Sequence, residues 1–76
     1  MDYLKIQIEL IELLKHKYKL KGNLVYTIFE TYGVLHYIKR NYKLLERLSK
    51  PLLIEKIEKY LTLKGFRIND IKGFRG

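Results

Sequence analysis

Basic side chains fall on one face of the segment around residues 34–48. Five of them follow one another at steps of 3, 1, 3 and 4 residues, and together we name them the basic row: His36, Lys39, Arg40, Lys43 and Arg47. At 100° per residue of an α-helix, these steps place all five within an arc of about 100°. No acidic residue occurs between Glu30 and Glu46. A one-sided row of cations suits a polyanion, because each phosphate that it neutralises releases counterions. The spacing therefore predicts nucleic-acid contact, with duplex DNA favoured.

The elements around the basic row have the order of a helix-turn-helix unit: a short helix, a break at a glycine and a longer basic helix. The second helix of such a unit offers its outer face to the major groove. We then expect Lys39 or Arg40 to donate to guanine, and Lys43 and Arg47 to contact phosphates. Asn41, at the edge of the row, would read adenine if it faces outward. A solvated face is the simpler alternative, because surface helices of basic proteins are often basic without any partner.

Further cations form a secondary basic and aromatic group. Its members are Lys15, Lys19, Lys64, Arg67, Lys72 and Arg75. The tetrapeptide Lys-Gly-Phe-Arg at 64–67 recurs at 72–75, so Phe66 and Phe74 lie between cations and either stack on bases or close the end of a small core. For the lysines near the end of the first helix, complementation of the helix dipole is the simpler explanation.

The composition argues against an enzyme. The chain has 76 residues, no Cys and a net charge of +8. His16 and His36 lie far apart without the spacing of metal ligands, and the sequence has no phosphate-binding glycine loop or nucleophile motif. We therefore expect a small binding module without metal or cofactor. No uncharged run approaches the roughly 20 residues of a membrane span, and no signal-peptide pattern is present, so a cytoplasmic location is expected.

Hydrophobic periodicity predicts an all-α fold with four helices. Their expected ranges are Asp2 to about Lys19, Leu24 to Tyr32, Val34 to about Leu48 and Pro51 to Leu63. Gly22, Gly33 and Gly65 are expected to end helices, and Asn23 and Ser49 to cap them. The prediction is a compact helical domain over residues 1–63 with a helix-turn-helix-like centre. Residues 64–76 form a basic C-terminal appendage, either a tail or a short hairpin around Asn69-Asp70.

The first predicted helix has an unusually wide apolar arc. Residues Leu4, Ile8, Ile11 and Tyr18 recur at helical steps, and further apolar residues widen the stripe. This width predicts packing on more than one neighbour or on a second chain. Seven tyrosines also favour a partner surface, for which Tyr26, Tyr37 and Tyr42 are the candidates.

Aromatic and glycine landmarks run through most of the chain. They read Val-Tyr-x-x-Phe at 25–29, Tyr-Gly-Val-x-x-Tyr-Ile at 32–38 and Tyr-x-x-Leu at 42–45, followed by a closing helix at 53–61. This order resembles a small bacterial domain family of unknown function. Genes of that family often neighbour genes for ADP-ribosyltransferase-like proteins, so the resemblance implies an antitoxin-type partner in a two-gene module. The chain departs from the family in charge, because the family tends to be acidic where the basic row lies.

Two other functions remain open. A protein–protein module, either a homodimer or a toxin-binding antitoxin without nucleic-acid affinity, would use the apolar arc of the first helix and the tyrosines. Binding of the first helix to anionic lipid is the third reading, and Glu9 and Glu12 on its polar face argue against it.

Overall fold

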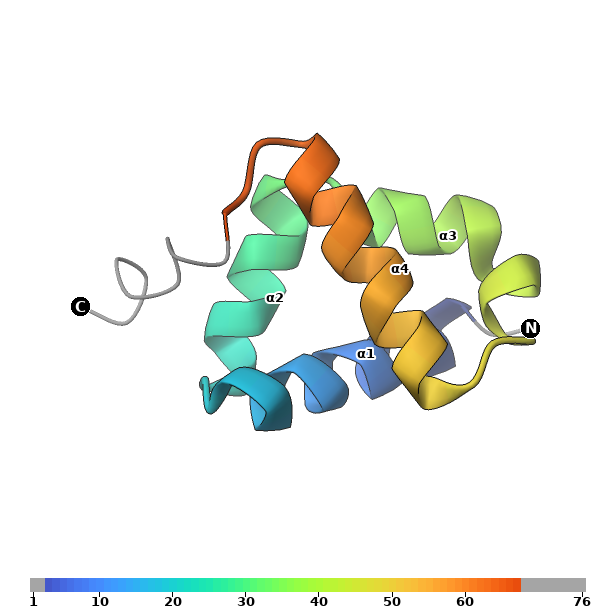
Figure 1. The fold of residues 1–76 in the computed structure, drawn as a ribbon, viewed down its shortest axis with the longest axis horizontal. Coiled ribbons are helices and arrows are strands. Elements are labelled where there is room, and N and C mark those ends of the chain that lie inside the picture. Colours follow the sequence, from blue (N-terminus) through green and yellow to red (C-terminus); the bar gives the residue numbers. More distant parts are fainter. Residues whose placement is uncertain (1–2, 68–76) are drawn as a thin grey trace.

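The computed structural model describes residues 3–67, which form four helices joined by short connections. The helices are α1 (Tyr3–Tyr18), α2 (Gly22–Thr31), α3 (Val34–Leu45) and α4 (Lys50–Leu63). Figure 1 shows α1 across the lower part of the molecule, α2 and α3 as two sides of a corner, and α4 crossing in front of them. The predicted all-α, four-helix fold is confirmed. The hairpin predicted around Asn69-Asp70 lies outside the described residues.

Each helix contributes three buried side chains to one shared core. These are Ile6, Leu10 and Leu14 of α1, Val25, Ile28 and Phe29 of α2, Val34, Ile38 and Leu45 of α3, and Leu53, Ile57 and Leu61 of α4. Steps of three and four residues keep such side chains on one face of a helix. Each buried side chain of this size stabilises the fold by about 1.5–3 kcal/mol relative to exposure.

The buried face of α1 is narrower than its apolar arc. Ile6, Leu10 and Leu14 lie one above another and are 0–6% exposed, whereas Leu4 and Ile8 are 52% and 62% exposed. Helix α1 packs on α2, α3 and α4, which is one of the two predicted alternatives, but these contacts leave Leu4 and Ile8 exposed. One helix has room for one buried face, and the remaining apolar side chains are left outside it.

The connection from α1 to α2 differs from the prediction. Lys19 takes the left-handed conformation after α1, with a φ of 54°, and Leu20 follows it into the core. Gly22, expected to end the first helix, is instead the first residue of α2. The N-cap of α2 is Lys21, which makes no side-chain cap, so the capping role expected of Asn23 is wrong. A lysine thus occupies the position that glycine prefers.

The other two glycine stops lie where the sequence predicts them. Gly33 has a φ of 75° and forms the corner between α2 and α3, and Gly65 has a φ of 96° after α4. Ser49 is the N-cap residue of α4, although its side chain makes no capping hydrogen bond, and Pro51 lies in the first turn. Because only glycine takes a positive φ without steric cost, these stops were readable from the sequence.

The chain beyond α4 returns to the core at Phe66. This ring is 3% exposed and meets the ring of Tyr32 edge to face, with centroids 5.0 Å apart and planes at 66°. The Phe66 backbone nitrogen donates to the Leu61 carbonyl oxygen at 2.9 Å. Phe66 therefore closes the end of the core, as one of the two predictions for it proposed, while Phe74 lies outside the described residues.

Candidate nucleic-acid interface

Helix α3 separates a buried face from a charged one. Val34, Ile38 and Leu45 are fully buried and anchor the helix against α1, α2 and α4. All five residues of the basic row are exposed: His36, Lys39, Arg40, Lys43 and Arg47. The periodicity of the buried residues explains this exposure, since a helix that points one face inward must turn the opposite face to solvent.

The basic row is free of carboxylate partners within residues 3–67. None of its members forms an ion pair there. The Lys39 Nζ lies 5.6 Å from the centre of the Tyr3 ring, a cation–π distance that links the row to α1. The charges of the row are consequently available to an external anion.

A kink divides α3 and interrupts the row. Asn41 has a φ of −122° and a ψ of 16°, which lie outside the helical range. His36, Lys39 and Arg40 belong to the regular segment before the kink, and Lys43 follows it. The position of Lys43 on an ideal helical wheel therefore does not carry over to the structure.

The third helix also ends earlier than predicted. It stops at Leu45, three residues before the expected Leu48. Arg47 lies in the turn that follows, where its backbone nitrogen donates to the Leu44 carbonyl oxygen at 3.2 Å. The structure therefore brings three members of the row together on one regular helix and sets Lys43 and Arg47 beyond them.

The Asn41 side chain is used inside the molecule. Its Nδ2 donates to the Tyr37 carbonyl oxygen at 2.9 Å, and the residue is half-buried. Asparagine side chains compete for backbone groups in this way and disturb regular helices. Contact of Asn41 with adenine was predicted only if its side chain faces outward. The side chain is instead bound to the backbone of its own helix.

The tyrosines divide between core and surface. Tyr37 of α3 and Tyr42 are half-buried, and Tyr26 is 41% exposed. Tyr37 stacks on Tyr60 of α4, and burial, followed by the charge of Tyr60, raises the pKa of Tyr37 above its ordinary 10.0. Of the three tyrosines predicted for a partner surface, Tyr26 alone is exposed.

Members of the secondary basic group have local partners. The Lys15 Nζ lies 3.7 Å from Glu12 on the same helix, and the Lys64 Nζ lies 5.4 Å from the centre of the Tyr60 ring. Lys19 and Arg67 are exposed. Lys72 and Arg75 lie outside the described residues. This group is therefore dispersed over the ends of α1 and α4, in contrast to the row on α3.

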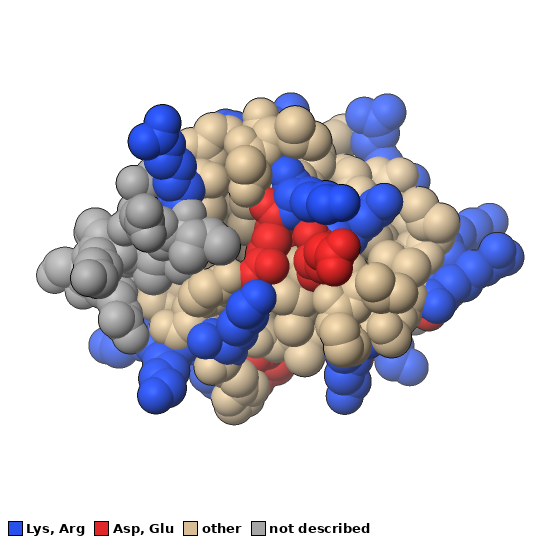
Figure 2. All heavy atoms as spheres, in the orientation of Figure 1, with Lys and Arg blue, Asp and Glu red and all other residues tan. Residues whose placement is uncertain are grey.

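Acidic side chains gather over α4. Figure 2 shows them near the centre of one face, where α4 lies, with Lys and Arg around them. Glu55 and Glu58 of α4 line the same shallow hollow. The α4 face therefore has a mixed character, whereas α3 itself carries no acidic residue before its C-cap, Glu46.

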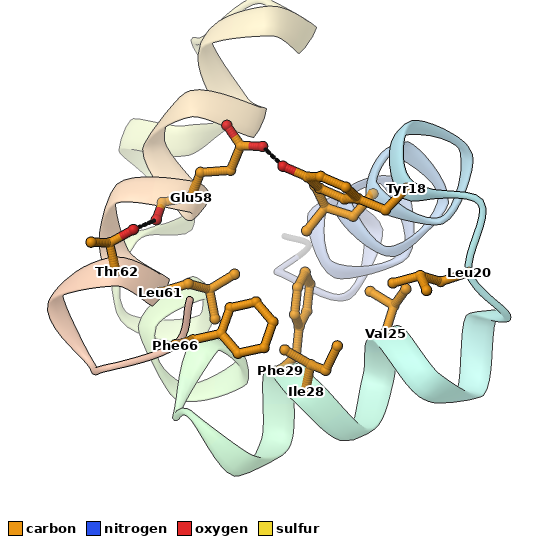
Figure 3. A pocket seen from close by; sticks show the side chains of 10 residues that line it. Tyr18, Leu20, Val25, Ile28, Phe29, Glu58, Leu61, Thr62 and Phe66 are labelled. Atoms are coloured by element: carbon orange, nitrogen blue, oxygen red, sulfur yellow. Dashed lines mark hydrogen bonds between the residues drawn. The ribbon is translucent and has the colours of Figure 1, made fainter. Parts of the chain in front are cut away.

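A contact between α1 and α4 was not predicted from the sequence. The Tyr18 hydroxyl donates to Glu58 (Figure 3). The Lys17 Nζ lies 2.5 Å from the same carboxylate. Burial, then the hydrogen bond and charge of Glu58, raise the pKa of Tyr18 above 10.0. The hydrogen bond to Glu58 raises the pKa of Lys17 above 10.5. The partners are about 40 residues apart, so no local pattern signals this contact.

The same contact covers a small cavity. Tyr18 and Glu58 lie at its edge, and the rings of Phe29 and Phe66 point into it (Figure 3). Its volume is about 20 Å³. Such a space holds about one water molecule, so it is a packing gap and has no room for a nucleotide or a flavin. Within the described residues, no His, Cys, Asp and Glu side chains group as metal ligands, and no helix is long and apolar enough to cross a membrane.

A family model described as "Protein of unknown function (DUF3791)" matches residues 5–64. The match spans nearly all of the four helices. The chain belongs to this family. Neither the curated proteins nor the solved structures contain a match to the chain. The prediction of a domain family of unknown function is thus confirmed, while the association with ADP-ribosyltransferase-like proteins stays a prediction.

The DUF3791 match includes every residue of the basic row, because it covers all of α3 and the turn after it. It stops at Lys64, before the buried Phe66. The basic row is therefore carried by the family domain, and the core contact of Phe66 comes from the segment that follows.

Proposed function

We propose that this DUF3791 domain is a non-enzymatic binding module that contacts nucleic acid, duplex DNA in particular, through the basic row of α3. One observation carries the proposal: the row is exposed and lacks carboxylate partners within residues 3–67. Its four Lys and Arg side chains need no rearrangement of internal ion pairs before they meet phosphates. Release of counterions then supplies the binding free energy.

The shape of the domain supports the same function. A two-residue turn at Tyr32 and Gly33 joins α2 to α3, and Figure 1 shows the two helices at a corner. Helix α1 packs on both of them. Such an arrangement turns the outer face of the second helix toward solvent, as helix-turn-helix proteins do with their recognition helix. Lys39 and Arg40, on the regular segment, are then the candidates for base contacts, and Lys43 and Arg47 for phosphates.

A salt titration against labelled duplex DNA tests the proposal. Four lysine and arginine contacts would give a slope of about −4 in log K against log salt concentration. Arg40→Gln should make the slope shallower by about 1. Lys21→Gln, just before α2, is the matched control, because it removes the same charge from an exposed site outside α3. Equal slopes for the two variants would show that total charge, and not the α3 face, drives binding.

A protein partner is the second candidate, and a hollow beside α3 favours it. Leu44, Leu48 and Leu52 line a depression of about 200 Å³ together with Glu55, Lys56 and Lys59. Leu44 and Leu52 are 52% and 49% exposed. An amphipathic, acidic segment suits such a surface, and an ADP-ribosyltransferase-like toxin is the partner that the predicted two-gene module implies.

Two variants separate the candidates. Leu52→Glu should abolish capture of the product of the adjacent gene while the DNA slope stays unchanged. Arg40→Gln should make the DNA slope shallower and leave the capture unchanged. Capture that survives Leu52→Glu would remove the hollow from consideration.

A further inference from the structure

One line of α1 is left uncovered by the rest of the described chain. Leu4 and Ile8 are more than half exposed, and Ile11 and Lys15 continue the line as half-buried residues. Their spacing of 4, 3 and 4 residues is the repeat of a coiled-coil seam. This line lies beside the buried face of α1 and so forms a second apolar face on the same helix.

Charges next to this line identify what covers it. Lys5 follows Leu4, and Glu12 follows Ile11, so the two charges occupy the same flank one heptad apart. Both are exposed. When two copies of a helix pair antiparallel, this flank faces the same flank of the other copy. Lys5 of each copy then lies beside Glu12 of the other.

We propose that a second copy of this chain binds the α1 face, with the two α1 helices antiparallel. In that register, Ile8 packs on the Ile11 of the other copy, and Leu4 packs along the aliphatic stem of its Lys15. The two-fold axis repeats each contact, so the interface is isologous. The surface is separate from the basic row, and the inference does not rest on nucleic-acid binding.

A parallel pairing of the two α1 helices would not bring Lys5 and Glu12 beside opposite charges. It would set the flank of Lys5 and Glu12 against the opposite flank, where Gln7 is uncharged and Leu14 is buried in its own domain. The ion pairs that Glu12 makes within its own copy do not prevent it from pairing with Lys5 of the other copy. Its oxygens lie 3.7 Å from Lys15 and 3.6 Å from His16 at exposed positions, where ion pairs contribute little.

Sedimentation equilibrium over a wide range of protein concentration tests the proposal. The wild-type chain should dimerise, and Ile8→Glu should be monomeric, because it buries two carboxylates at the axis. Ile8 is 62% exposed, so the variant should keep its fold, which circular dichroism checks. Leu63→Glu, at a leucine of α4 that is 83% exposed, is the matched control and should dimerise like the wild type.

Charge reversal tests the direction of pairing. Lys5→Glu and Glu12→Lys should each weaken the dimer by about tenfold or more, since both attractive pairs become repulsive. An equimolar mixture of the two variants should dimerise again, because each Glu then meets a Lys. A mixture that stays monomeric would overturn the antiparallel register. A wild-type chain that is monomeric throughout, or a dimer that persists in Ile8→Glu, would overturn the proposal as a whole.

Discussion

The ring of Tyr37 in α3 stacks on the ring of Tyr60 in α4, with centroids 4.2 Å apart and 29° between their planes. Tyr37 follows His36 directly, and the two residues lie about 100° apart around the helix axis. Holding Tyr37 against α4 therefore sets the rotation of α3 about its own axis. The stack therefore acts together with the buried Val34, Ile38 and Leu45 to keep the basic row turned toward solvent.

Loss of this stack should cost measurable stability. Tyr60→Leu keeps an apolar side chain at the site and removes the ring pair, so we expect the free energy of unfolding to fall by about 1 kcal/mol. Urea denaturation followed by circular dichroism measures it. Tyr26→Leu, at an exposed tyrosine, is the matched control and should change stability by less than about 0.5 kcal/mol. Equal losses in both variants would show that the stack contributes nothing specific.

Alkaline pH should destabilise the domain. Burial raises the pKa of both Tyr18 and Tyr37 above 10.0, so the folded state holds these phenolic protons more tightly than the unfolded state does. The stability they contribute is fully present below pH 10 and is lost as the pH rises from there through the folded-state pKa. Lys17 acts in the same direction, because its hydrogen bond to Glu58 raises its pKa above 10.5.

Urea midpoints measured between pH 8 and pH 11 test this sign. The wild-type midpoint should be steady up to about pH 9 and fall above it. Tyr18→Phe should start from a lower stability, because the hydrogen bond to Glu58 is worth about 1 kcal/mol, and should fall less steeply above pH 10. An identical alkaline fall in Tyr18→Phe and the wild type would assign the effect to other groups.

Gly22, the first residue of α2, and Gly33, which follows the helix, should respond to substitution with opposite signs. Gly33 needs its φ of 75°, so Gly33→Ala should destabilise the fold by about 1–2 kcal/mol. Gly22 begins α2 without a positive φ, and an added Cβ would lie 3.9 Å from the Lys15 side chain, an ordinary contact. Gly22→Ala should therefore stabilise by up to about 1 kcal/mol. Thermal melts of the pair measure both signs, and a loss in both variants would contradict the assignment of Gly22 to the helix.

This pair of glycines also shows where the sequence is informative about the fold. Gly33 and Gly65 were predicted correctly because each follows a helix whose apolar residues end clearly before it. Gly22 was assigned to the wrong role because glycine is the residue most often found at a left-handed stop, while here Lys19 takes that conformation at φ 54°. Packing of Leu20 into the core accompanies this choice, and such tertiary contacts are invisible to a local rule.

The candidate site was predictable only where it depends on local periodicity. Exposure of Lys39 and Arg40 follows from the periodicity of the buried residues on the other face of α3. The contact between Tyr18 and Glu58 had no local signal, because it depends on how α1 and α4 cross. The kink at Asn41 was also missed, since the weak helix propensity of asparagine does not specify where a helix bends.

The kink itself gives the last prediction. The Asn41 Nδ2 holds the Tyr37 carbonyl oxygen at 2.9 Å, and alanine removes this bond while favouring a regular helix. Asn41→Ala should therefore bring residue 41 from its φ of −122° into the helical range and change stability by less than about 1 kcal/mol. The three-bond coupling between the amide and α protons of residue 41 reports φ directly and should fall to a helical value. Asn23→Ala, at an exposed asparagine in α2, should leave the coupling at residue 41 unchanged. A coupling that stays large in Asn41→Ala would assign the kink to the packing of Tyr42 and Leu45 and not to the asparagine side chain.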